Sequence, residues 1–431
     1  MAEQPIYIGI VGFGNVGSGT YKTLLDNQAN IDRKVGRPIR VKKIADVDWS
    51  RPRPVGLSVP REMQTADAMA LVNDPEISIV IESIGGVKPS LDLVLAALRA
   101  GKNVITSNKE LVARHGKELF DAAAERNLDL MFEGSVGGGI PIIRPLKSCL
   151  AANRINRIMG IVNGTTNFIL TRMTQEKTEF GDALAEAQRL GYAEPDPTND
   201  VEGFDAAYKL AILTSIAFET RVRVESIYRE GITGLAARDM EYARQFGYVV
   251  KLLAIGAQVD GGLELRVHPT LLPASHPLAA VSGPFNAIFV TGSSVGEVMF
   301  YGQGAGPLPT GSAMVGDVID VARNIRFGAT GRVSCTCFDE KPALPIEELQ
   351  TRYYLRTDVA DRPGVLAAIA QVFGEEGVSL GSVLQMGASG ETAEIVWLTH
   401  TTRECQMQRS LTRISALPEV NKINSRIRVE A

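Results

Sequence analysis

The chain is poor in the residues that most often build metal centres and covalent nucleophiles. It has four histidines, so histidine-based metal or triad chemistry is not expected to be its theme. It also has only four cysteines, Cys149, Cys335, Cys337 and Cys405. Cysteines this few and scattered indicate a reducing compartment and small packing roles. We therefore expect a cytoplasmic protein.

Long apolar runs and basic runs are also missing. No stretch of about 18 uncharged apolar residues occurs, so no transmembrane helix and no membrane association are expected. The formal net charge of −4 argues against nucleic acid and acidic membrane surfaces as partners. A strand-like run begins at residue 6, so we expect no signal peptide. A chain of 431 residues is long enough for two or three domains.

A glycine motif follows the first strand-like run. Residues 6–11 are rich in β-formers, and a helical pattern continues to Leu25. Between them stands Gly12-Phe13-Gly14-Asn15-Val16-Gly17. In this strand–turn–helix setting, G-x-G-x-x-G lets backbone amides approach a pyrophosphate at a helix N-terminus. The motif predicts a dinucleotide site for NADP or NAD.

Strand and helix patterns alternate after this motif. Strands are expected at 39–45, 77–83, 103–106 and 128–132, and helices at 89–99 and 108–126. This order predicts an α/β fold with an open parallel sheet of the Rossmann type. We expect this nucleotide domain to span residues 1–136 and to be completed by about 305–337.

The pattern changes from about residue 137. Strands are expected at 157–162, 249–259, 263–269 and 287–291, and helices at 165–174, 180–190 and 310–326. We predict an α+β catalytic, substrate and oligomerisation domain over residues 137–304. Residues 338–350 carry two prolines and resemble a linker. Residues 351–431 show a βαββαβ pattern, which is typical of a ferredoxin-like domain.

The acidic segment at residues 191–209 precedes a predicted helix. Its sequence is Gly-Tyr-Ala-Glu-Pro-Asp-Pro-Thr-Asn-Asp-Val-Glu-Gly-Phe-Asp-Ala-Ala-Tyr-Lys. Asp205 and Lys209 stand at i and i+4, so both side chains leave one helix face. An apolar surface lowers the proton affinity of a lysine and a nearby carboxylate restores it, which suits proton transfer. An ordinary intrahelical salt bridge would give the same spacing.

Five segments in this order resemble homoserine dehydrogenases of the long form, which end in an ACT domain. They are Thr106-Ser107-Asn108-Lys109, Glu133-Gly-Ser-Val-Gly-Gly-Gly-Ile-Pro141, Gly160-Ile-Val-Asn-Gly-Thr-Thr-Asn-Phe-Ile-Leu170, residues 191–209, and Gly302 through Thr310. The resemblance covers essentially the whole chain. It implies reversible, NAD(P)H-dependent reduction of L-aspartate 4-semialdehyde to L-homoserine, in threonine, methionine and isoleucine biosynthesis.

The resemblance also implies roles for individual residues. Lys209 matches the proposed general acid/base, and Lys109 is the other candidate for moving the proton. Substrate binding is implied for Glu194, Asp205 and Gly191, where an acidic pair suits an ammonium group. Cofactor contacts are implied for Thr106, Lys109 and Gly302 in addition to the glycine motif.

A glycine-rich turn lies between the two predicted N-terminal domains. By resemblance, the backbone oxygens of Glu133, Val136, Gly138 and Ile140 bind a monovalent cation, sodium or potassium. Hard cations prefer oxygen ligands. The same glycines would equally serve as a hinge.

The choice between NAD and NADP stays open. Asp46 or Asp48 ends the second strand, where an acid would bond the ribose 2′-hydroxyl of NAD. Arg51 and Arg53 follow closely and would suit the 2′-phosphate of NADP.

The tail carries Asp361-Arg-Pro-Gly364-Val-Leu, which resembles the ACT signature. In this family such a tail senses threonine, so the resemblance implies feedback inhibition by L-threonine. It also implies a homodimer or homotetramer, which the edge strands of a ferredoxin-like tail favour.

Two other functions were weighed. The first is another NAD(P) oxidoreductase of the aspartate pathway that uses a cysteine nucleophile, for which Cys149 is the best-placed candidate. The second is a non-catalytic sensor of a dinucleotide and an amino acid. A sensor would be expected to lack Glu194, Asp205 or Lys209, and all three are present.

Overall fold

The computed structural model describes residues 4–53, 55–389 and 391–430. Residues 1–3 and 431, at the outer ends of the first and last predicted domains, lie outside this range. The chain divides into two compact units. Unit 1 holds residues up to 158, 208–224 and 286–340, and unit 2 holds 159–207, 225–285 and the residues from 341 onward.

No helix among the described residues is both long and apolar enough to cross a bilayer.

Unit 1 contains a six-stranded parallel sheet in the order β3-β2-β1-β4-β5-β6. The strands are β1 (Ile6–Val11), β2 (Ile39–Ala45), β3 (Gln64–Thr65), β4 (Ile77–Glu82), β5 (Asn103–Thr106) and β6 (Leu130–Met131). The accompanying helices are α1 (Asn15–Asp26), α2 (Gln28–Val35), α3 (Ala68–Val72), α4 (Ser90–Arg99) and α5 (Lys109–Ala124). This strand order is that of a Rossmann fold, so the predicted parallel nucleotide domain is confirmed.

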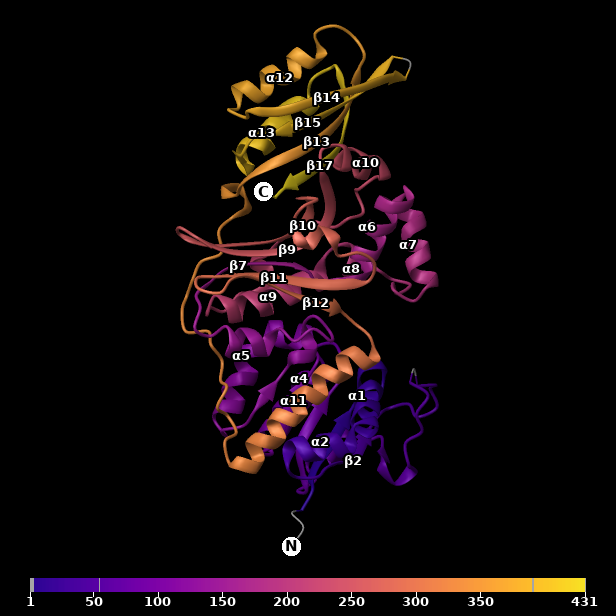
Figure 1. Ribbon diagram of the computed structural model, residues 1–431, viewed down its shortest axis with the longest axis vertical. Coiled ribbons are helices and arrows are strands. Elements are labelled where there is room, and N and C mark those ends of the chain that lie inside the picture. The colour runs from indigo at the N-terminus through magenta and orange to yellow at the C-terminus, as the bar shows by residue number, and fades with distance from the viewer. Residues whose placement is uncertain (1–3, 54, 390, 431) are drawn as a thin grey trace. The chain divides into compact units, whose positions relative to one another are not determined.

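A later helix, α11 (Pro307–Phe327), returns to this sheet and lies beside α1 (Figure 1). Glycines make the close approach possible, because a Cβ added to Gly19 would overlap the carbonyl of Pro307. Met314 and Val318 on α11 share one buried cluster with Ile8 and Ile10 of β1.

The second part of the fold mixes helices with a mixed sheet. Its strands are β7 (Ile155–Ile161), β8 (Tyr228–Arg229), β9 (Tyr248–Val259), β10 (Gly262–Pro273), β11 (Phe285–Gly292) and β12 (Gly296–Gln303). Its helices are α6 (Gly164–Glu176), α7 (Phe180–Arg189), α8 (Thr198–Val201), α9 (Phe204–Ala217) and α10 (Ala237–Gln245). Strand β10 runs antiparallel to β9 and parallel to β8, as a mixed α+β sheet requires.

The C-terminal part of unit 2 forms a four-stranded antiparallel sheet in the order β17-β13-β15-β14. Its elements are β13 (Gln350–Ala360), α12 (Val365–Glu375), β14 (Leu380–Ser389), β15 (Thr392–Thr399), β16 (Thr402–Arg403), α13 (Glu404–Ser415) and β17 (Val420–Val429). The rings of Phe373 on α12 and Trp397 on β15 lie 5.6 Å apart in its core. The βαββαβ prediction is therefore confirmed.

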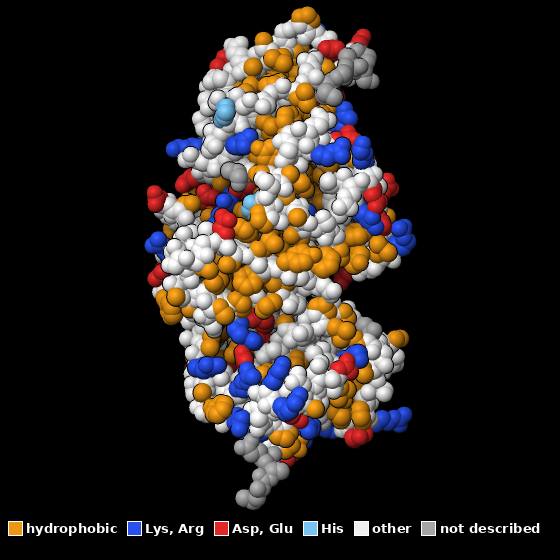
Figure 2. All heavy atoms as spheres, in the orientation of Figure 1, with side chains coloured by type: hydrophobic (Ala, Val, Ile, Leu, Met, Phe, Trp, Pro, Cys, Tyr) orange, Lys and Arg blue, Asp and Glu red, His pale blue; other side chains and the backbone are white. Residues whose placement is uncertain are grey.

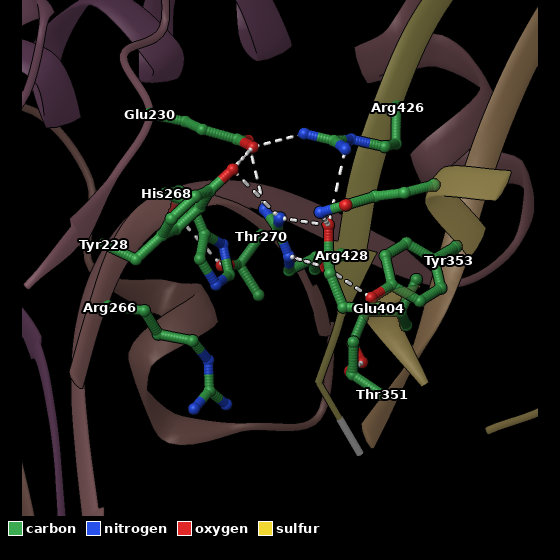
Figure 3. A network of polar contacts seen from close by, with 12 residues as sticks. Tyr228, Glu230, Arg266, His268, Thr270, Thr351, Tyr353, Glu404, Arg426 and Arg428 are labelled. Carbon is green, nitrogen blue, oxygen red and sulfur yellow. Dashed lines mark hydrogen bonds and ion pairs between the residues drawn. The ribbon is translucent and has the colours of Figure 1, made fainter. Parts of the chain in front are cut away.

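The last strand joins this C-terminal sheet to the rest of unit 2. Thr270 and Leu271 of β10 pair in parallel with Arg428 and Val429 of β17. Figure 3 shows Arg428 between two carboxylates: its Nε lies 2.8 Å from Glu404 Oε2, and its Nη1 lies 3.1 Å from Glu230 Oε2. Arg428 is 2% exposed, so these ion pairs are buried. Together with the strand pairing, they join the C-terminal sheet to the rest of unit 2.

Several elements were not expected from the sequence, among them α2, α10 and β12. The segment α2 is a polar surface helix with few apolar positions, and it gives no helical apolar stripe. Strand β12 extends to Gln303 and so includes the first two residues of the segment 302–310 that carried the resemblance. Glycines at both ends of β12 obscured its alternating pattern.

Candidate active site

The glycine loop after β1 has the geometry that a pyrophosphate needs. Gly12 has φ +89°, and a Cβ at Gly17 would overlap the carbonyl oxygen of Gly12. Gly14 is exposed, and no heavy atom lies within 4 Å of the position its Cβ would take. No side chain caps the start of α1. The first amides of α1 are thus left for an anion, so the loop fits a dinucleotide.

The carboxylate of Asp46 holds this loop from the end of β2. Its Oδ2 accepts hydrogen bonds from Phe13 N at 2.8 Å and Arg53 Nη1 at 3.3 Å. Arg53 also donates to the carbonyls of Phe13 (2.8 Å) and Asp48 (2.5 Å), and its side chain is 9% exposed. Arg51 differs, because its side chain is 74% exposed. Of the two arginines, Arg51 is the accessible one.

The predicted cofactor residues Thr106 and Lys109 lie at the carboxyl end of β5, where parallel sheets bind their ligands. Thr106 is buried and its hydroxyl donates to Glu82 Oε2 at 2.5 Å. The side chain of Asn108 accepts from Leu111 N at 3.1 Å and so caps α5. Lys109 is the first residue of α5 and is half-buried. Glu82 was not anticipated from the sequence.

Within unit 1, the start of α5 contacts the start of α9. The hydroxyl of Tyr208 donates to Glu110 Oε1 at 3.3 Å and accepts from Arg114 Nη2 at 2.7 Å. Glu110 follows Lys109 and Tyr208 precedes Lys209, so the backbones that carry the two predicted catalytic lysines are tied together.

Asp205 and Lys209 stand one turn apart on α9, and both are buried, with 5% and 9% exposure. The side-chain amide of Asn163 donates to Asp205 Oδ2 at 2.9 Å and to Asp200 Oδ1 at 2.6 Å. The oxygen of the same amide accepts from Thr166 N at 2.9 Å and caps α6. Sequence reasoning gave Asn163 no role, although it lies in the segment 160–170 that carried the resemblance.

The other two predicted substrate residues lie on the turn after α7. Glu194 and Gly191 are exposed, and Gly191 has φ +77°, a conformation that favours glycine. The carbonyl of Tyr192 accepts a hydrogen bond from the hydroxyl of Thr165 at 2.5 Å, which ties the turn to α6. The side chain of Glu194 therefore starts from a surface turn that a ligand can reach.

The predicted cation loop is largely buried. Among the residues that the structure describes, three of its backbone carbonyls accept no hydrogen bond. The carboxylate of Glu133 accepts hydrogen bonds from the amides of Ile142 (2.6 Å), Ile143 (2.8 Å) and Arg144 (2.8 Å), so its side chain is already used. Within the described residues, no hydrogen bond reaches the carbonyls of Val136, Gly138 or Ile140. Buried carbonyls without donors fit a hard cation.

Asp317 of α11 supports this loop. Its Oδ2 accepts from Glu133 N at 2.9 Å, and its Oδ1 accepts from Arg144 Nη2 at 2.9 Å. Burial, together with the charge of Glu133, raises the pKa of Asp317 to about 7. No motif pointed to this carboxylate, because Asp317 lies far along the chain from the loop.

The segment after β12 touches the same loop. Gly302 is half-buried at the end of β12. A Cβ at Gly138 would overlap the carbonyl oxygen of Gly304, and a Cβ at Gly304 would overlap the buried amide of Asn286. Gly304 is thus held between the cation loop and β11.

No group of three or more His, Cys, Asp or Glu side chains suited to a metal ion occurs in the described part of the chain. Cys149, the alternative nucleophile, is exposed.

Comparison with known families matches three consecutive parts of the chain. Residues 12–133 match "Homoserine dehydrogenase, NAD binding domain", residues 141–319 match "Homoserine dehydrogenase", and residues 353–418 match "ACT domain". The homoserine dehydrogenase of Corynebacterium glutamicum is 46% identical over 98% of this chain and 95% of its own length. That of Bacillus subtilis is 43% identical over 99% of both chains.

Solved structures agree with these matches. The crystal structure of a homoserine dehydrogenase from Thiobacillus denitrificans has a TM-score of 0.93 and 43% identity, and the match covers 100% of this chain and 99% of that one. A hyperthermophilic archaeal homoserine dehydrogenase in complex with NADPH has a TM-score of 0.63 and 30% identity over 74% of this chain and 98% of that one. The chain therefore belongs to the homoserine dehydrogenase family and is an NAD(P)-dependent oxidoreductase with a C-terminal ACT domain.

Proposed function

We propose that the enzyme reduces L-aspartate 4-semialdehyde to L-homoserine, reversibly, as a step of threonine, methionine and isoleucine biosynthesis. The observation that carries this proposal is the buried pair on α9, in which Asp205 is oriented by Asn163 and Lys209 follows one turn later. Family membership favours this dehydrogenase over a cysteine-dependent oxidoreductase or a non-catalytic sensor.

Lys209 is the group that moves the proton. NADPH or NADH, when bound, supplies the hydride. Lys209 gives its proton to the carbonyl oxygen of the semialdehyde during reduction and takes a proton from the homoserine hydroxyl during oxidation. Lys209 is 9% exposed and follows Asp205 by one turn of α9, which supports its placement beside the bound substrate. Lys109, at the start of α5, is the second candidate.

The substrate's amino-acid end meets acidic groups. Asp205 and Glu194 bind the ammonium group, and Gly191 shapes the turn that carries Glu194. Asp205 is fixed by the Asn163 amide, whereas Glu194 is exposed. The ammonium group of the substrate therefore meets one rigid carboxylate, Asp205, and one adaptable carboxylate, Glu194.

The cofactor is held by Gly12, Phe13, Gly14, Asn15, Val16 and Gly17, together with Thr106, Lys109 and Gly302. The open space at Gly14 and the uncapped start of α1 support the pyrophosphate position. NADP and NAD both remain candidates. Arg51 is the residue that would distinguish them: its Nε pairs with Asp48 Oδ2 at 2.9 Å, yet its side chain is 74% exposed, whereas that of Arg53 is 9% exposed.

A monovalent cation, sodium or potassium, binds the backbone oxygens of Glu133, Val136, Gly138 and Ile140. The carbonyls without donors in this loop support the site, as does the use of the Glu133 side chain elsewhere. The cation would order the loop that touches Gly304, and so the cofactor segment beside it.

L-Threonine inhibits through the C-terminal domain. Gly364 has φ +92° at the start of α12, and no heavy atom lies within 4 Å of the position its Cβ would take. The turn at 361–364 is exposed, so a small amino acid can approach its backbone.

A homodimer or homotetramer is the expected assembly. Strand β12 exposes Met299 (41%) and Tyr301 (54%). Figure 2 shows hydrophobic side chains gathered where Figure 1 draws β11 and β12. Light scattering coupled to size exclusion tests this, and a monomer at micromolar concentration would contradict it.

One assay tests the function directly. The oxidation of L-homoserine is followed with NADP and with NAD, each with and without L-threonine. Turnover with one cofactor, suppressed by threonine, is expected. No turnover of homoserine with either cofactor would refute the reaction, and turnover without a threonine effect would refute only the regulation.

The proton-transfer role is tested by Lys209→Ala against Lys109→Ala. Loss of a general acid–base group lowers kcat by about 10²–10⁴-fold. Lys209→Ala should show this loss while cofactor binding, measured by calorimetry, survives. Near-normal kcat in Lys209→Ala would move the role to Lys109.

A further inference from the structure

Two cysteines of unit 1 line a small cavity beside a cationic side chain. Cys335 and Cys337 lie in the segment after α11, and Arg221 Nη2 lies 3.2 Å from Cys335 Sγ. The cavity is also lined by Lys147 and by Ser215 of α9. Its volume of about 30 Å³ holds about two water molecules. Both cysteines are half-buried, so reagents can approach them from solvent as well as from this cavity.

The segment that carries the two cysteines is fixed at both ends. On one side, Lys147 Nζ donates to the carbonyl of Ser334 at 2.9 Å. On the other, Asp339 N donates to Glu219 O at 2.9 Å, and the hydroxyl of Thr220 donates to Asp339 O at 2.8 Å. These anchors hold both sulfurs against the same wall of the cavity.

The chain also bends between the anchors. Phe338 N donates to Thr336 O at 3.0 Å, which makes a tight turn centred on Cys337. Residues two apart have Cα atoms at most about 7 Å apart. A disulfide spans Cα separations of about 4.4–6.8 Å, so two residues at this spacing in the sequence lie inside or close to that range.

The surroundings shift the pKa values of the two thiols in opposite directions. A hydrogen bond from the Cys337 thiol, aided by the charges of Arg221 and Lys147, lowers the pKa of Cys335. The same hydrogen bond, together with burial, raises the pKa of Cys337. A thiolate is the reactive form of cysteine, so Cys335 is the nucleophile and Cys337 holds a proton close to it.

We propose that Cys335 and Cys337 form an oxidation site, at which hydrogen peroxide converts the two thiols into an intramolecular disulfide.

The reaction has two balanced steps. First, the Cys335 thiolate attacks one peroxide oxygen, so an S–O bond forms, the O–O bond breaks, and hydroxide leaves and is protonated to water. This makes a sulfenic acid and moves two electrons from sulfur to oxygen. Second, the Cys337 sulfur attacks the sulfenic sulfur, the S–S bond forms, and the S–O bond breaks. The released hydroxide takes the thiol proton of Cys337 and leaves as a second water.

The test uses the full-length protein and reads thiol chemistry, so it does not depend on the proposed reaction. Trypsin releases residues 333–352 as one peptide, which contains both cysteines and no other. After treatment with hydrogen peroxide and then iodoacetamide, this peptide should lack two hydrogens and carry no alkyl group. The exposed Cys149 is the internal control, because iodoacetamide should still alkylate it after the peroxide treatment.

Variants separate the roles of the two sulfurs. In Cys337→Ser, peroxide should leave a sulfenic acid on Cys335 that dimedone traps. Cys149→Ser should form the disulfide like the wild type. Circular dichroism checks that each variant is folded. If Cys337→Ser does not fold, the wild type and the arginine variant below still decide the question.

The Arg221→Met variant tests whether the charge of Arg221 stabilises the Cys335 thiolate. The measured quantity is the rate of alkylation of Cys335 as a function of pH. In the wild type at pH 6.5, Cys335 should be alkylated at least about tenfold faster than Cys149. In Arg221→Met, the alkylation of Cys335 should be slower at pH 6.5. Its rate should recover near pH 9.5, where the thiol ionises without the positive charge of the arginine. Equal rates for Cys335 and Cys149, over-oxidation without a disulfide, or an unchanged profile in Arg221→Met would each overturn the proposal.

Discussion

The side-chain nitrogen of Asn163 lies 2.9 Å from the carboxylate oxygen Oδ2 of Asp205. The same nitrogen donates to Asp200, and the amide oxygen caps α6. One side chain therefore joins the start of α6 to two carboxylates of the acidic segment. The orientation of the proposed substrate carboxylate depends on a residue outside its own helix.

Replacing Asn163 with leucine should weaken substrate binding selectively. A hydrogen bond to a charged group is worth about 1.5–3 kcal/mol, which corresponds to about a ten- to hundredfold change in an equilibrium constant. We expect Asn163→Leu to raise the KM for L-homoserine by about tenfold or more and to leave the KM for the cofactor unchanged. Steady-state kinetics with each substrate varied in turn measures both.

Asn167→Leu is the matched control. Asn167 also lies on α6, but its amide nitrogen donates to the carbonyls of Val281, Gly283 and Phe285. This variant should lose stability without a selective change in the KM for homoserine. The same rise in KM in both variants would argue against a specific role for Asn163.

Arg51→Ala should reveal the cofactor preference. If the enzyme uses NADP, the exposed guanidinium of Arg51 faces the 2′-phosphate, and its loss should lower kcat/KM for NADPH by about tenfold while NADH is unaffected. Arg53→Ala should instead impair both cofactors and lower the melting temperature, because Arg53 holds the Phe13 and Asp48 carbonyls. Equal losses with NADPH and NADH in Arg51→Ala would remove Arg51 from the 2′ position.

Gly138→Ala should disturb the cation loop. Gly138 has φ +57°, which costs a residue with a Cβ about 1–2 kcal/mol, and its Cβ would also overlap the Gly304 carbonyl. We expect a lower melting temperature and a higher salt concentration for half-maximal activity. Gly181→Ala on α7 is the control: no heavy atom lies within 4 Å of its Cβ position, so it should be neutral or slightly stabilising. An unchanged salt requirement in Gly138→Ala would contradict the cation site.

Glu404→Gln should destabilise the protein strongly. Glu404 is fully buried, and its carboxylate accepts from Arg428 Nε at 2.8 Å and from the Tyr353 hydroxyl at 2.5 Å (Figure 3). Removing one partner of a buried ion pair costs about 3–5 kcal/mol, because the other charge stays buried. Chemical denaturation measures the loss. Glu375→Gln, at a surface pair with Arg413, should leave stability almost unchanged.

The same pair predicts an acid-sensitive step. Burial alone would raise the pKa of Glu404, but the hydrogen bond and charge of Arg428, with Tyr353, outweigh it and hold the pKa below 4.5. The unfolded chain therefore binds this proton at a higher pH than the folded one does. The stability that Glu404 contributes is complete above pH 4.5 and is lost as pH falls through the lower folded pKa. The free energy of unfolding should thus fall less steeply in acid for Glu404→Gln than for the wild type.

Much of the fold was predictable because its signals are local. The glycines of residues 12–17 follow a strand pattern directly, and the strand predicted at 39–45 has the bounds of β2. The βαββαβ tail was predicted for the same reason, since each of its elements carries its own apolar period. The polar helix α2 and the glycine-bounded β12 lack such a period, and both were missed.

The candidate site was predictable only in part. Motifs drew attention to Asp205, but the partner that orients it, Asn163, lies in another element and becomes visible only when the chain is folded. Asp317 supports the cation loop from far along the sequence in the same way. Contacts of this kind depend on tertiary geometry, which a single sequence does not contain.

The pairing of β17 with β10 has a consequence for how the chain is made. The ribosome synthesises β17 long after β10, so until residues 428–429 emerge Thr270 and Leu271 of β10 lack these strand partners and Glu230 lacks Arg428. Open edges of this kind invite association with other chains. This part of the second unit can therefore complete its sheet only after β17 is made, and a product truncated before residue 428 would leave this stretch of β10 without its partner.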